Sequence, residues 1–240
     1  MQRYFSVSKS EILINNEDVH HIENVMRSKI GDFFEVVFNS KIYLAEITQI
    51  KPLGFNIKEE LEENNELENK ITLFYALSKG DKNELVMQKA TELGVSKIVL
   101  ISSSRCVVKM DQNDFNKKKS RFEKIIKEAA EQSKRNIIPE IIGVYNIDKI
   151  PQDLLCDHNF VAYECDKGYT TSTLKNYQNI KKTESVSILI GSEGGLTDKE
   201  VNSLLEKSFI KISLGKRILR TETAAINALS GLTLILEANA

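Results

Sequence analysis

The sequence predicts an α/β fold with a mainly parallel sheet and flanking helices, preceded by a smaller β-rich module. From residue 71 onward, strand patterns alternate with amphipathic helix patterns, which is typical of parallel sheets covered by helices. Before residue 58, strand patterns follow one another closely, which favours a small barrel. Residues 58–70 hold six glutamates and no β-branched residue, which indicates a solvated linker or a hairpin tip. We therefore place the domains at 1–70 and 71–240.

The N-terminal module has two clear strand patterns and one helix pattern. FFEVVF (33–38) and KIYLAEITQI (41–50) are rich in β-branched and aromatic residues, and the two residues between them favour a tight turn. The helix pattern, NEDVHHIENVMR, covers residues 16–27. We expect His20 and His21 within it to cap or pack this module rather than to act in catalysis.

Strands and helices alternate through the C-terminal part. The strand patterns lie at 71–77, 96–101, 159–164, 185–190 and 209–213, and the helix patterns at 82–93, 114–135, after Thr197 and at 221–238. Gly94 suits the position that follows a helix. Thr197 and Glu200 have the spacing of a capping box, and Thr221 suits the N-cap of the last helix.

Composition and charge exclude several classes of protein. The 240 residues carry a formal net charge of −1, so nucleic-acid binding would require a local basic patch. Three cysteines without CxxC spacing indicate a reducing cytoplasm, and three histidines, two of them adjacent, argue against a zinc site. No apolar run approaches the ~18 residues of a membrane span. Residues 1–10 have no apolar core, so we expect no signal peptide.

The stretch ILIGSEGGLTDKEV (188–201) joins an apolar strand to a helix through three glycines. In open α/β sheets, ligands bind at the carboxyl ends of strands, and Gly191, Gly194 and Gly195 allow a ligand to approach the backbone. The loop has no lysine, and Glu193 would repel a phosphate, so a neutral or cationic ligand fits better than a nucleotide phosphate. A plain strand–helix connection remains the alternative.

A second glycine-containing loop lies in ISLGKRILRTETAA (212–225). Lys216, Arg217 and Arg220 stand between a strand that ends at Gly215 and the start of the last helix. A helix N-terminus attracts anions, and arginine can add bidentate contacts to phosphate. The alternative is a solvated loop, but one acidic and one basic loop at the end of the same sheet favour a binding site.

Together, IGSEGGLTDKE (190–200) and LGKRILRTETAAINAL (214–229) resemble the SPOUT class of RNA methyltransferases. Within that class the sequence is similar to the bacterial 16S rRNA (uracil-N3) methyltransferase family. The segments HHIENVMRSKIGD, LSKGDKNELVMQKATELGV, SSRCVVK and RFEKIIKEAAEQSKRNIIPEI match in order, so the resemblance covers nearly the whole chain. The family usually has proline where this chain has Ser192, and serine is expected to loosen the loop.

The resemblance implies S-adenosylmethionine (SAM) as methyl donor, a trefoil knot in the C-terminal domain, a PUA-like N-terminal barrel that binds RNA, and a homodimer. It also implies that three loops hold the cofactor through backbone groups and apolar walls. The implied cofactor-binding residues are Tyr163, Glu164, Ile190, Gly191, Glu193, Gly194, Gly195, Ile212, Leu214, Gly215, Ile218, Leu219, Thr223 and Ala224. No metal is implied.

Methylation of uracil N3 requires loss of the N3 proton and stabilisation of the anion that develops. Arg220 is the candidate for this stabilisation, and Glu222 is the candidate base or an orienting partner of Arg220. The alternative for Glu222 is an ordinary carboxylate in the first turn of a helix. The candidate RNA-binding residues are Arg3, Arg27, Arg105, Lys109, Lys117, Lys118, Arg121, Arg135 and Arg217. For any one lysine of the long basic helix, a solvated helix face is an equal alternative.

The expected substrate is thus 16S rRNA of the small ribosomal subunit. Three alternatives remain open at this point: a SPOUT enzyme for another rRNA or tRNA site, a non-catalytic RNA-binding or assembly protein with the same fold, and a small-molecule α/β enzyme. The run Arg220–Thr223 argues against lost activity, and the basic helix and separate β module argue against a small-molecule enzyme.

Overall fold

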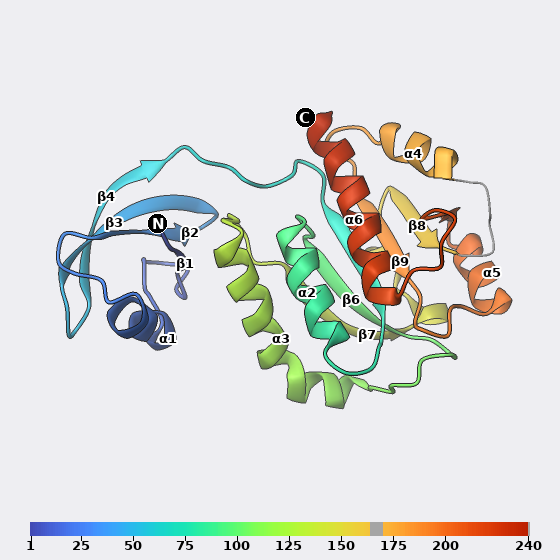
Figure 1. Ribbon diagram of the computed structural model, residues 1–240, viewed down its shortest axis with the longest axis horizontal. Helices are drawn as coiled ribbons and strands as arrows, with labels where there is room; N and C mark the ends of the chain where they lie inside the picture. The colour runs from blue at the N-terminus through green and yellow to red at the C-terminus, as the bar shows by residue number, and fades with distance from the viewer. Residues whose placement is uncertain (164–169, 240) are drawn as a thin grey trace. The chain divides into compact units, whose positions relative to one another are not determined.

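The computed structural model describes residues 1–163 and 170–239, which divide into two compact units (Figure 1). The first unit comprises residues 1–66 together with 130–137. The second comprises residues 67–129 and the described residues from 138 onward. The predicted Glu164 contact to the cofactor lies outside the described residues.

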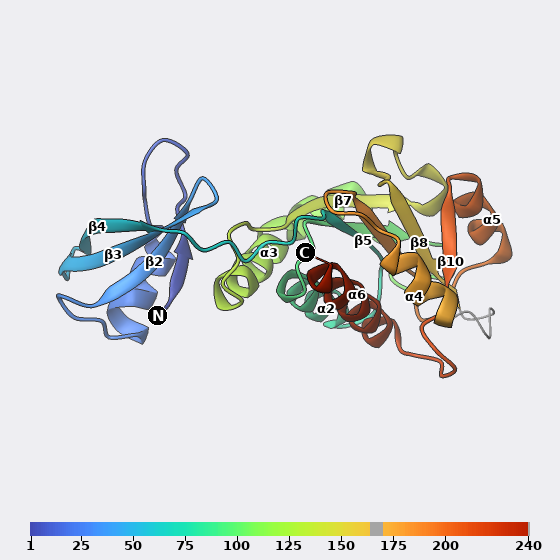
Figure 2. The same cartoon turned by 90° about the horizontal axis from the view of Figure 1, so that it is seen from above.

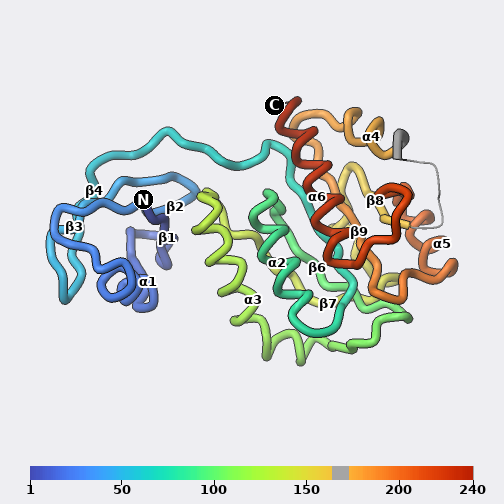
Figure 3. The backbone as a smooth tube through the Cα atoms, viewed as in Figure 1, coloured from blue at the N-terminus to red at the C-terminus, as the bar shows by residue number. Residues whose placement is uncertain are grey.

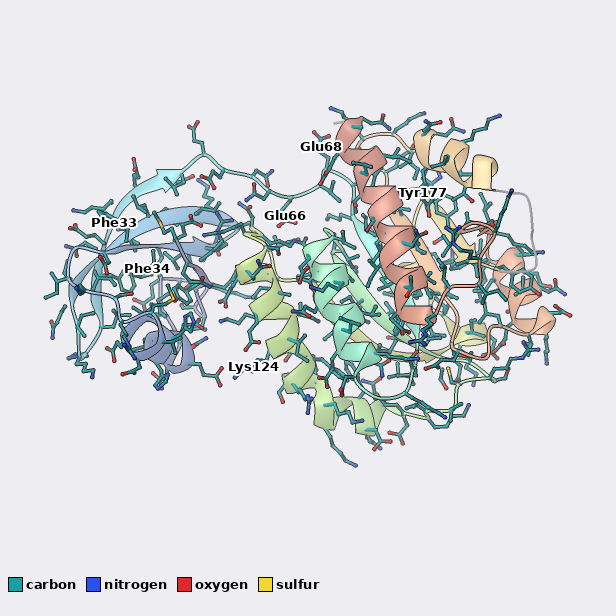
Figure 4. All side chains as sticks on the ribbon, in the orientation of Figure 1. Phe33, Phe34, Glu66, Glu68, Lys124 and Tyr177 are labelled. Atoms are coloured by element: carbon teal, nitrogen blue, oxygen red, sulfur yellow. The ribbon has the colours of Figure 1, made fainter. Side chains whose placement is uncertain are left out.

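The first unit is built on a four-stranded sheet in the order β1-β2-β3-β4. Its strands are β1 (Arg3–Phe5), β2 (Phe33–Phe38), β3 (Lys41–Gln49) and β4 (Gly54–Leu61). β1 runs parallel to β2, and the other neighbours are antiparallel. The helix α1 (Asn16–His20) continues into a π-helical turn, His21–Val25. Successive residues of β2 point to opposite faces, so Phe34 is buried and Phe33 is exposed (Figure 4).

The start of the predicted acidic linker is a strand, which corrects that expectation. Residues 58–61 belong to β4 and pair with β3. The ammonium group of Lys58 pairs with Glu46 across the two strands, and Lys41 pairs with Glu60 at 2.7 Å. β4 is an edge strand, and charged side chains on such a strand protect it from pairing with other chains. Because of these charged residues, the sequence of β4 has the composition of a linker although it forms a strand.

The end of helix α3 (Gln112–Gln132) and the segment after it complete the first unit. Ala130 packs in a small cluster with Phe5, Val37 and Ile42. Val37 and Ala130 belong to the same cluster although they lie more than ninety positions apart in the sequence. The first unit therefore includes a segment that the chain reaches only after residues 71–102 of the second unit.

A buried ion-pair network fixes that segment. Arg3 is fully buried, and its Nε donates to Glu35 Oε2 at 2.7 Å. Its Nη1 donates to the backbone carbonyl of Lys134, whose own Nζ lies 3.0 Å from Glu35 Oε2. Arg135 Nε donates to Glu66 Oε1 at 3.2 Å, on the segment that follows β4 (Figure 4). The network stabilises the first unit as a whole.

The second unit is built on a six-stranded sheet in the order β10-β8-β9-β5-β6-β7, and all its neighbouring strands are parallel. The strands are β5 (Ile71–Ala76), β6 (Lys97–Ser102), β7 (Glu140–Asn146), β8 (His158–Ala162), β9 (Val186–Ile190) and β10 (Phe209–Ile212). The central strand β5 is buried along its whole length, as expected of a strand covered on both faces. The predicted parallel α/β sheet is therefore confirmed.

Helices cover this sheet. They are α2 (Lys82–Glu92), α3, α4 (Thr170–Gln178), α5 (Asp198–Glu206) and α6 (Thr221–Ala238). Figures 1 and 2 show α2 and α6 side by side, and Figure 2 shows α4 and α5 on opposite sides of β10. Two 3-10 turns, Ile147–Lys149 and Gln152–Leu154, connect β7 to β8.

Two of three predicted helix ends are confirmed. Gly94 has φ +82° and follows the C-cap of α2, and the Thr197–Glu200 capping box opens α5. The prediction for Thr221 was wrong, because Arg220 is the N-cap of α6 and its side chain makes no capping bond. The hydroxyl of Thr221 instead donates to the Gly191 carbonyl at 2.7 Å. This bond ties the start of α6 to the end of β9, after the long connection from β10 (Figure 3).

Candidate active site

The candidate site lies at the carboxyl end of the parallel sheet. β5, β9 and β10 end at Ala76, Ile190 and Ile212, and because these strands are parallel, the loops that follow them emerge at the same edge. Ligands of open α/β proteins bind at this edge. The structure therefore brings the two glycine-containing loops to one end of the sheet, together with the residues that lead into α2.

The loop after β9 is a tight turn. The Gly195 N–H donates to the Ser192 carbonyl at 2.8 Å, and Gly195 has φ +69°, a conformation that favours glycine. Ser192 is buried, and its hydroxyl donates to the Gly195 carbonyl at 3.4 Å. Ser192 thus adds a side-chain hydrogen bond within the turn.

Arg105 holds this loop in place. Its Nη1 donates to the carbonyls of Gly194 and Leu196 at 3.1 and 3.2 Å. A Cβ on Gly194 would lie 2.9 Å from Arg105 Cβ and 3.1 Å from its carbonyl oxygen, so only glycine allows this approach. Arg105, which was expected to contact RNA, therefore has a structural role in the loop.

Glu193 projects from the same loop toward the start of α2. Its Oε1 accepts a hydrogen bond from Lys82 Nζ at 3.0 Å and one from the Lys79 N–H at 3.3 Å. Burial on its own raises the pKa of Glu193, but hydrogen bonds from its own N–H, from Lys82 and from the Lys79 N–H outweigh burial and lower it. Glu193 is therefore held as a carboxylate that bridges two loops.

Glu222 approaches the same ammonium group from the first turn of α6. Lys82 Nζ lies 3.5 Å from Glu222 Oε2, which is long for a hydrogen bond. The Glu222 side chain is only 14% exposed, and among the described residues its Oε2 has no hydrogen-bond partner. Two carboxylates thus share one ammonium group, and one buried acceptor is left unsatisfied.

Lys82 was not among the predicted site residues. It lies in a segment that carried the family resemblance, but a lysine in the first turn of a predicted helix is usually solvated. The hydrogen bond with Glu193, and then the charges of Glu193 and Glu222, raise the pKa of Lys82. Only the tertiary contacts reveal this role.

The loop between β10 and α6 presents basic and apolar side chains. Gly215 has φ +114°, and an added Cβ would meet nothing within 4 Å. Lys216, Arg217 and Arg220 are exposed, while Leu214 and Leu219 are half-buried. Ile218 was expected to form an apolar wall, but its side chain is 84% exposed, so it forms no wall within one chain.

The other predicted cofactor residues have different surroundings. The Tyr163 hydroxyl donates to Asp198 Oδ1 at 2.8 Å, and its N–H donates to the Ile212 carbonyl at 3.1 Å. The side chains of Ile190 and Ile212 are buried in the core, so these side chains cannot contact a ligand at the surface. Thr223 is exposed and Ala224 is half-buried at the start of α6.

The candidate RNA-binding residues separate into two sets. Exposed side chains belong to Arg27, Lys109, Lys117, Lys118, Arg121 and Arg217. Arg121 Nε pairs with Glu84 at 2.7 Å while remaining largely exposed, and Lys109 Nζ donates to the Ser103 carbonyl at 3.1 Å. Arg3 and Arg135 are buried in internal ion pairs, so the prediction that they contact RNA is corrected.

The residues that the structure describes contain no group of three or more His, Cys, Asp or Glu side chains arranged to hold a metal ion. Over those same residues, none of the helices combines the length and the apolar character needed to cross a membrane.

The fold is that of an α/β protein with a parallel sheet, and its candidate site lies at the carboxyl edge of that sheet. A family model described as an RNA methyltransferase domain matches residues 65–233, and one described as an RNA methyltransferase PUA domain matches residues 14–60. The chain therefore belongs to the RNA methyltransferase family, which confirms the resemblance and the expectation of a methyltransferase.

Curated relatives and solved structures agree with this assignment. Ribosomal RNA small subunit methyltransferase E of Bacillus subtilis is 38% identical over 97% of this chain and 96% of its own length. A Legionella pneumophila methyltransferase in complex with SAM is 32% identical, with a TM-score of 0.85 over 97% of this chain and 96% of its own. A Neisseria gonorrhoeae ribosomal RNA small subunit methyltransferase E bound to SAM is 26% identical, with a TM-score of 0.81 over 98% and 97%.

Proposed function

We propose that the protein transfers a methyl group from SAM to N3 of a specific uridine in 16S rRNA of the small ribosomal subunit. The observation that carries the proposal is Glu222 Oε2, a buried acceptor without a hydrogen-bond partner among the described residues. The N3–H of uracil is a donor that could satisfy it. The names of the relatives, which are small subunit rRNA methyltransferases, support the substrate.

The residues at the carboxyl edge fit SAM better than a nucleotide phosphate. Glu193 and Glu222 provide two carboxylates against the single ammonium of Lys82, which suits a cationic ligand. Around Gly215 an added Cβ would meet nothing within 4 Å, and the half-buried Leu214 and Leu219 supply apolar surface, which suits a neutral adenine. SAM supplies the methyl group when bound; the two solved relatives that contain it support this cofactor.

Side chains of this protein remove the proton from the base and stabilise the charge that develops on it. Glu222 accepts the N3 proton of uracil, since the transfer requires a nitrogen lone pair. The guanidinium of the exposed Arg220, the residue immediately before α6, stabilises the negative charge that develops on the base. The target base must first leave any helix in which its N3 is paired.

RNA contacts are proposed on the exposed basic residues of α3 and of the loop before α6. Lys117, Lys118, Arg121 and Arg217 are exposed, in a chain whose net charge is only −1. The charges of lysine and arginine bind phosphates without reading sequence. The match to a PUA domain over residues 14–60 supports a role for the first unit in RNA binding.

The remaining expectations are carried forward as parts of the proposal. We infer a domain division near residue 70, a trefoil knot in the C-terminal domain, a homodimer and a cytoplasmic location. The bond between Thr221 and the Gly191 carbonyl, which ties the last helix to the end of β9, supports a knotted path.

Mass-spectrometric mapping of modified nucleotides tests the proposal directly. Small-subunit rRNA from cells that lack the gene should lose one N3-methyluridine, and the purified protein with SAM should restore it. Supplying naked rRNA and assembled small subunits in parallel identifies the true substrate. Loss of a different modified nucleotide would reassign the site, and an unchanged nucleotide profile would refute the proposal.

A further inference from the structure

Lys82 connects three elements of the candidate site. It is the first residue of α2, and its Nζ lies 3.0 Å from Glu193 in the loop after β9 and 3.5 Å from Glu222 in the first turn of α6. The Lys79 N–H reaches Glu193 Oε1 as well, at 3.3 Å. One ammonium group therefore links two carboxylates that are 29 positions apart in the sequence.

The position of Lys82 in its own helix makes this arrangement informative. The N-terminus of a helix carries partial positive charge, so a cation in the first turn is unfavourable by itself. The contact with the two carboxylates offsets that cost. Tyr75, at the end of β5, is the other titratable group that interacts with both Glu193 and Glu222, and burial raises the pKa of its hydroxyl. Over residues 1–163 and 170–239, Lys82 is thus the cation that forms ion pairs with both carboxylates.

We propose that Lys82 is a positioning residue for methyl transfer: it holds Glu193 and Glu222 in fixed relation and thereby joins the loop after β9 to the start of α6. The inference rests on the proposed function, in which both carboxylates serve the reaction. Lys82 acts through them, because its ammonium group is already engaged by Glu193. An ion pair shared between two loops fixes their separation, and a site loses activity steeply when its groups are displaced.

The test uses the full-length protein with Lys82→Met, which removes the charge, and Lys82→Arg, which keeps it. Lys89→Met is the matched control, since Lys89 lies on the same helix and pairs with Glu92. Calorimetry measures the Kd for SAM, steady-state kinetics separate kcat from KM for RNA, and hydrogen exchange of peptides from residues 191–197 reports on the loop. Thermal unfolding checks that each variant is folded.

We expect Lys82→Met to lower kcat by about tenfold or more, with little change in KM for RNA, because positioning acts on the transition state. Exchange in the 191–197 peptides should become faster, and Lys82→Arg should recover kcat to within about threefold. In a Glu222→Gln background, Lys82→Met should lower kcat less than about twofold further, because coupled residues are not additive. The Lys89→Met control should match the wild type in every measurement.

Two results would overturn the inference. One is a Lys82→Met variant with wild-type kcat and unchanged loop exchange. The other is a double variant whose loss equals the product of the two single losses, since Lys82 would then act independently of Glu222. The exchange measurement does not depend on turnover, so it still tests Lys82 if the wild-type protein methylates no rRNA. A wild-type protein that methylates no rRNA would refute the proposed function, not the role of Lys82.

Discussion

Each unit of the molecule contains a cluster of glutamates and basic residues, and the two clusters differ in how their charges are matched. The cluster of the first unit pairs three carboxylates with three cations: Glu35, Glu63 and Glu66 with Arg3, Lys134 and Arg135. In the second unit, Glu193 and Glu222 both face Lys82, and among the described residues the buried Glu222 Oε2 has no hydrogen-bond partner.

This difference distinguishes charged residues that stabilise the fold from charged residues that remain available to bind a ligand. Breaking a matched, buried pair leaves an uncompensated charge and is strongly destabilising. An unsatisfied buried acceptor stabilises nothing in the free protein, and such groups are common at functional sites. Glutamates of the first cluster should therefore control stability, and those of the second should control activity.

The largest expected effect is on catalysis at Arg220. Arg220→Ala should lower kcat by about 10²–10³-fold, because a charge aimed at the developing anion is lost. The Kd for SAM should stay close to that of the wild type, since the side chain is exposed and makes no capping bond. Calorimetry and single-turnover methylation measure the two quantities. A variant with wild-type turnover would remove Arg220 from the catalytic group.

The same substitution in the two clusters compares them most directly. Glu35→Gln should lower the free energy of unfolding by about 3 kcal/mol, because the buried Arg3 loses its closest carboxylate. Glu222→Gln should change the free energy of unfolding by less than about 0.5 kcal/mol, since no hydrogen bond is lost.

Urea denaturation and methylation assays on both Glu→Gln variants measure this contrast. At a temperature where both proteins are folded, only the Glu222 variant should show a large but measurable loss of kcat. Equal destabilisation by the two substitutions would contradict the distinction between the clusters.

The pH dependence of stability tests the role of Glu35 in the first cluster. Burial on its own raises the pKa of Glu35, but hydrogen bonds from Arg3 and Lys134 outweigh it and hold the pKa below its ordinary value of 4.5. Such a carboxyl stabilises the folded state above its unfolded pKa and loses that effect as pH falls through its folded pKa. The stability difference between wild type and Glu35→Gln should be constant down to about pH 5 and shrink below about pH 4.5. If this stability difference stayed constant down to about pH 3, ionisation of Glu35 would not be its cause.

The smallest expected effect concerns the exposed lysines of α3. Lys117 and Lys119 make only long surface ion pairs, at 3.4 and 3.6 Å, which contribute little stability. Reversing the charges of Lys117, Lys118 and Lys119 together should leave thermal unfolding unchanged. It should weaken RNA binding and reduce the slope of log Kd against log salt by about 2–3. An unchanged slope would remove this surface from the RNA interface.

Local patterns were sufficient to predict much of the fold. β2 and α6 have the predicted bounds, 33–38 and 221–238, because aromatic and β-branched residues fill the strand and a long run rich in alanine and leucine fills the helix. The capping box at Thr197 is likewise a short-range signal. β7 and α4 were missed, and β4 was read as a linker in part because an edge strand tolerates charged residues.

The site was predicted less completely, for a physical reason. Loop glycines and first-turn carboxylates can be recognised locally, and the structure brings Glu193 and Glu222 to one ammonium group. The partners of a charge, however, depend on contacts between distant segments. Arg3 therefore looked like a surface residue and is buried, whereas Lys82 looked like a surface residue and is the centre of the site.

The inclusion of residues 130–137 in the first unit also has a consequence for biosynthesis. The ribosome releases the chain from its N-terminus, and residues 1–66 alone leave Arg3 without the Lys134 carbonyl and Glu66 without Arg135. The first unit can finish folding only after residue 137 has emerged, when β5, α2 and β6 are already outside. Folding of the first unit must therefore wait for synthesis of part of the second, and an N-terminal fragment that stops at residue 70 should remain incompletely folded.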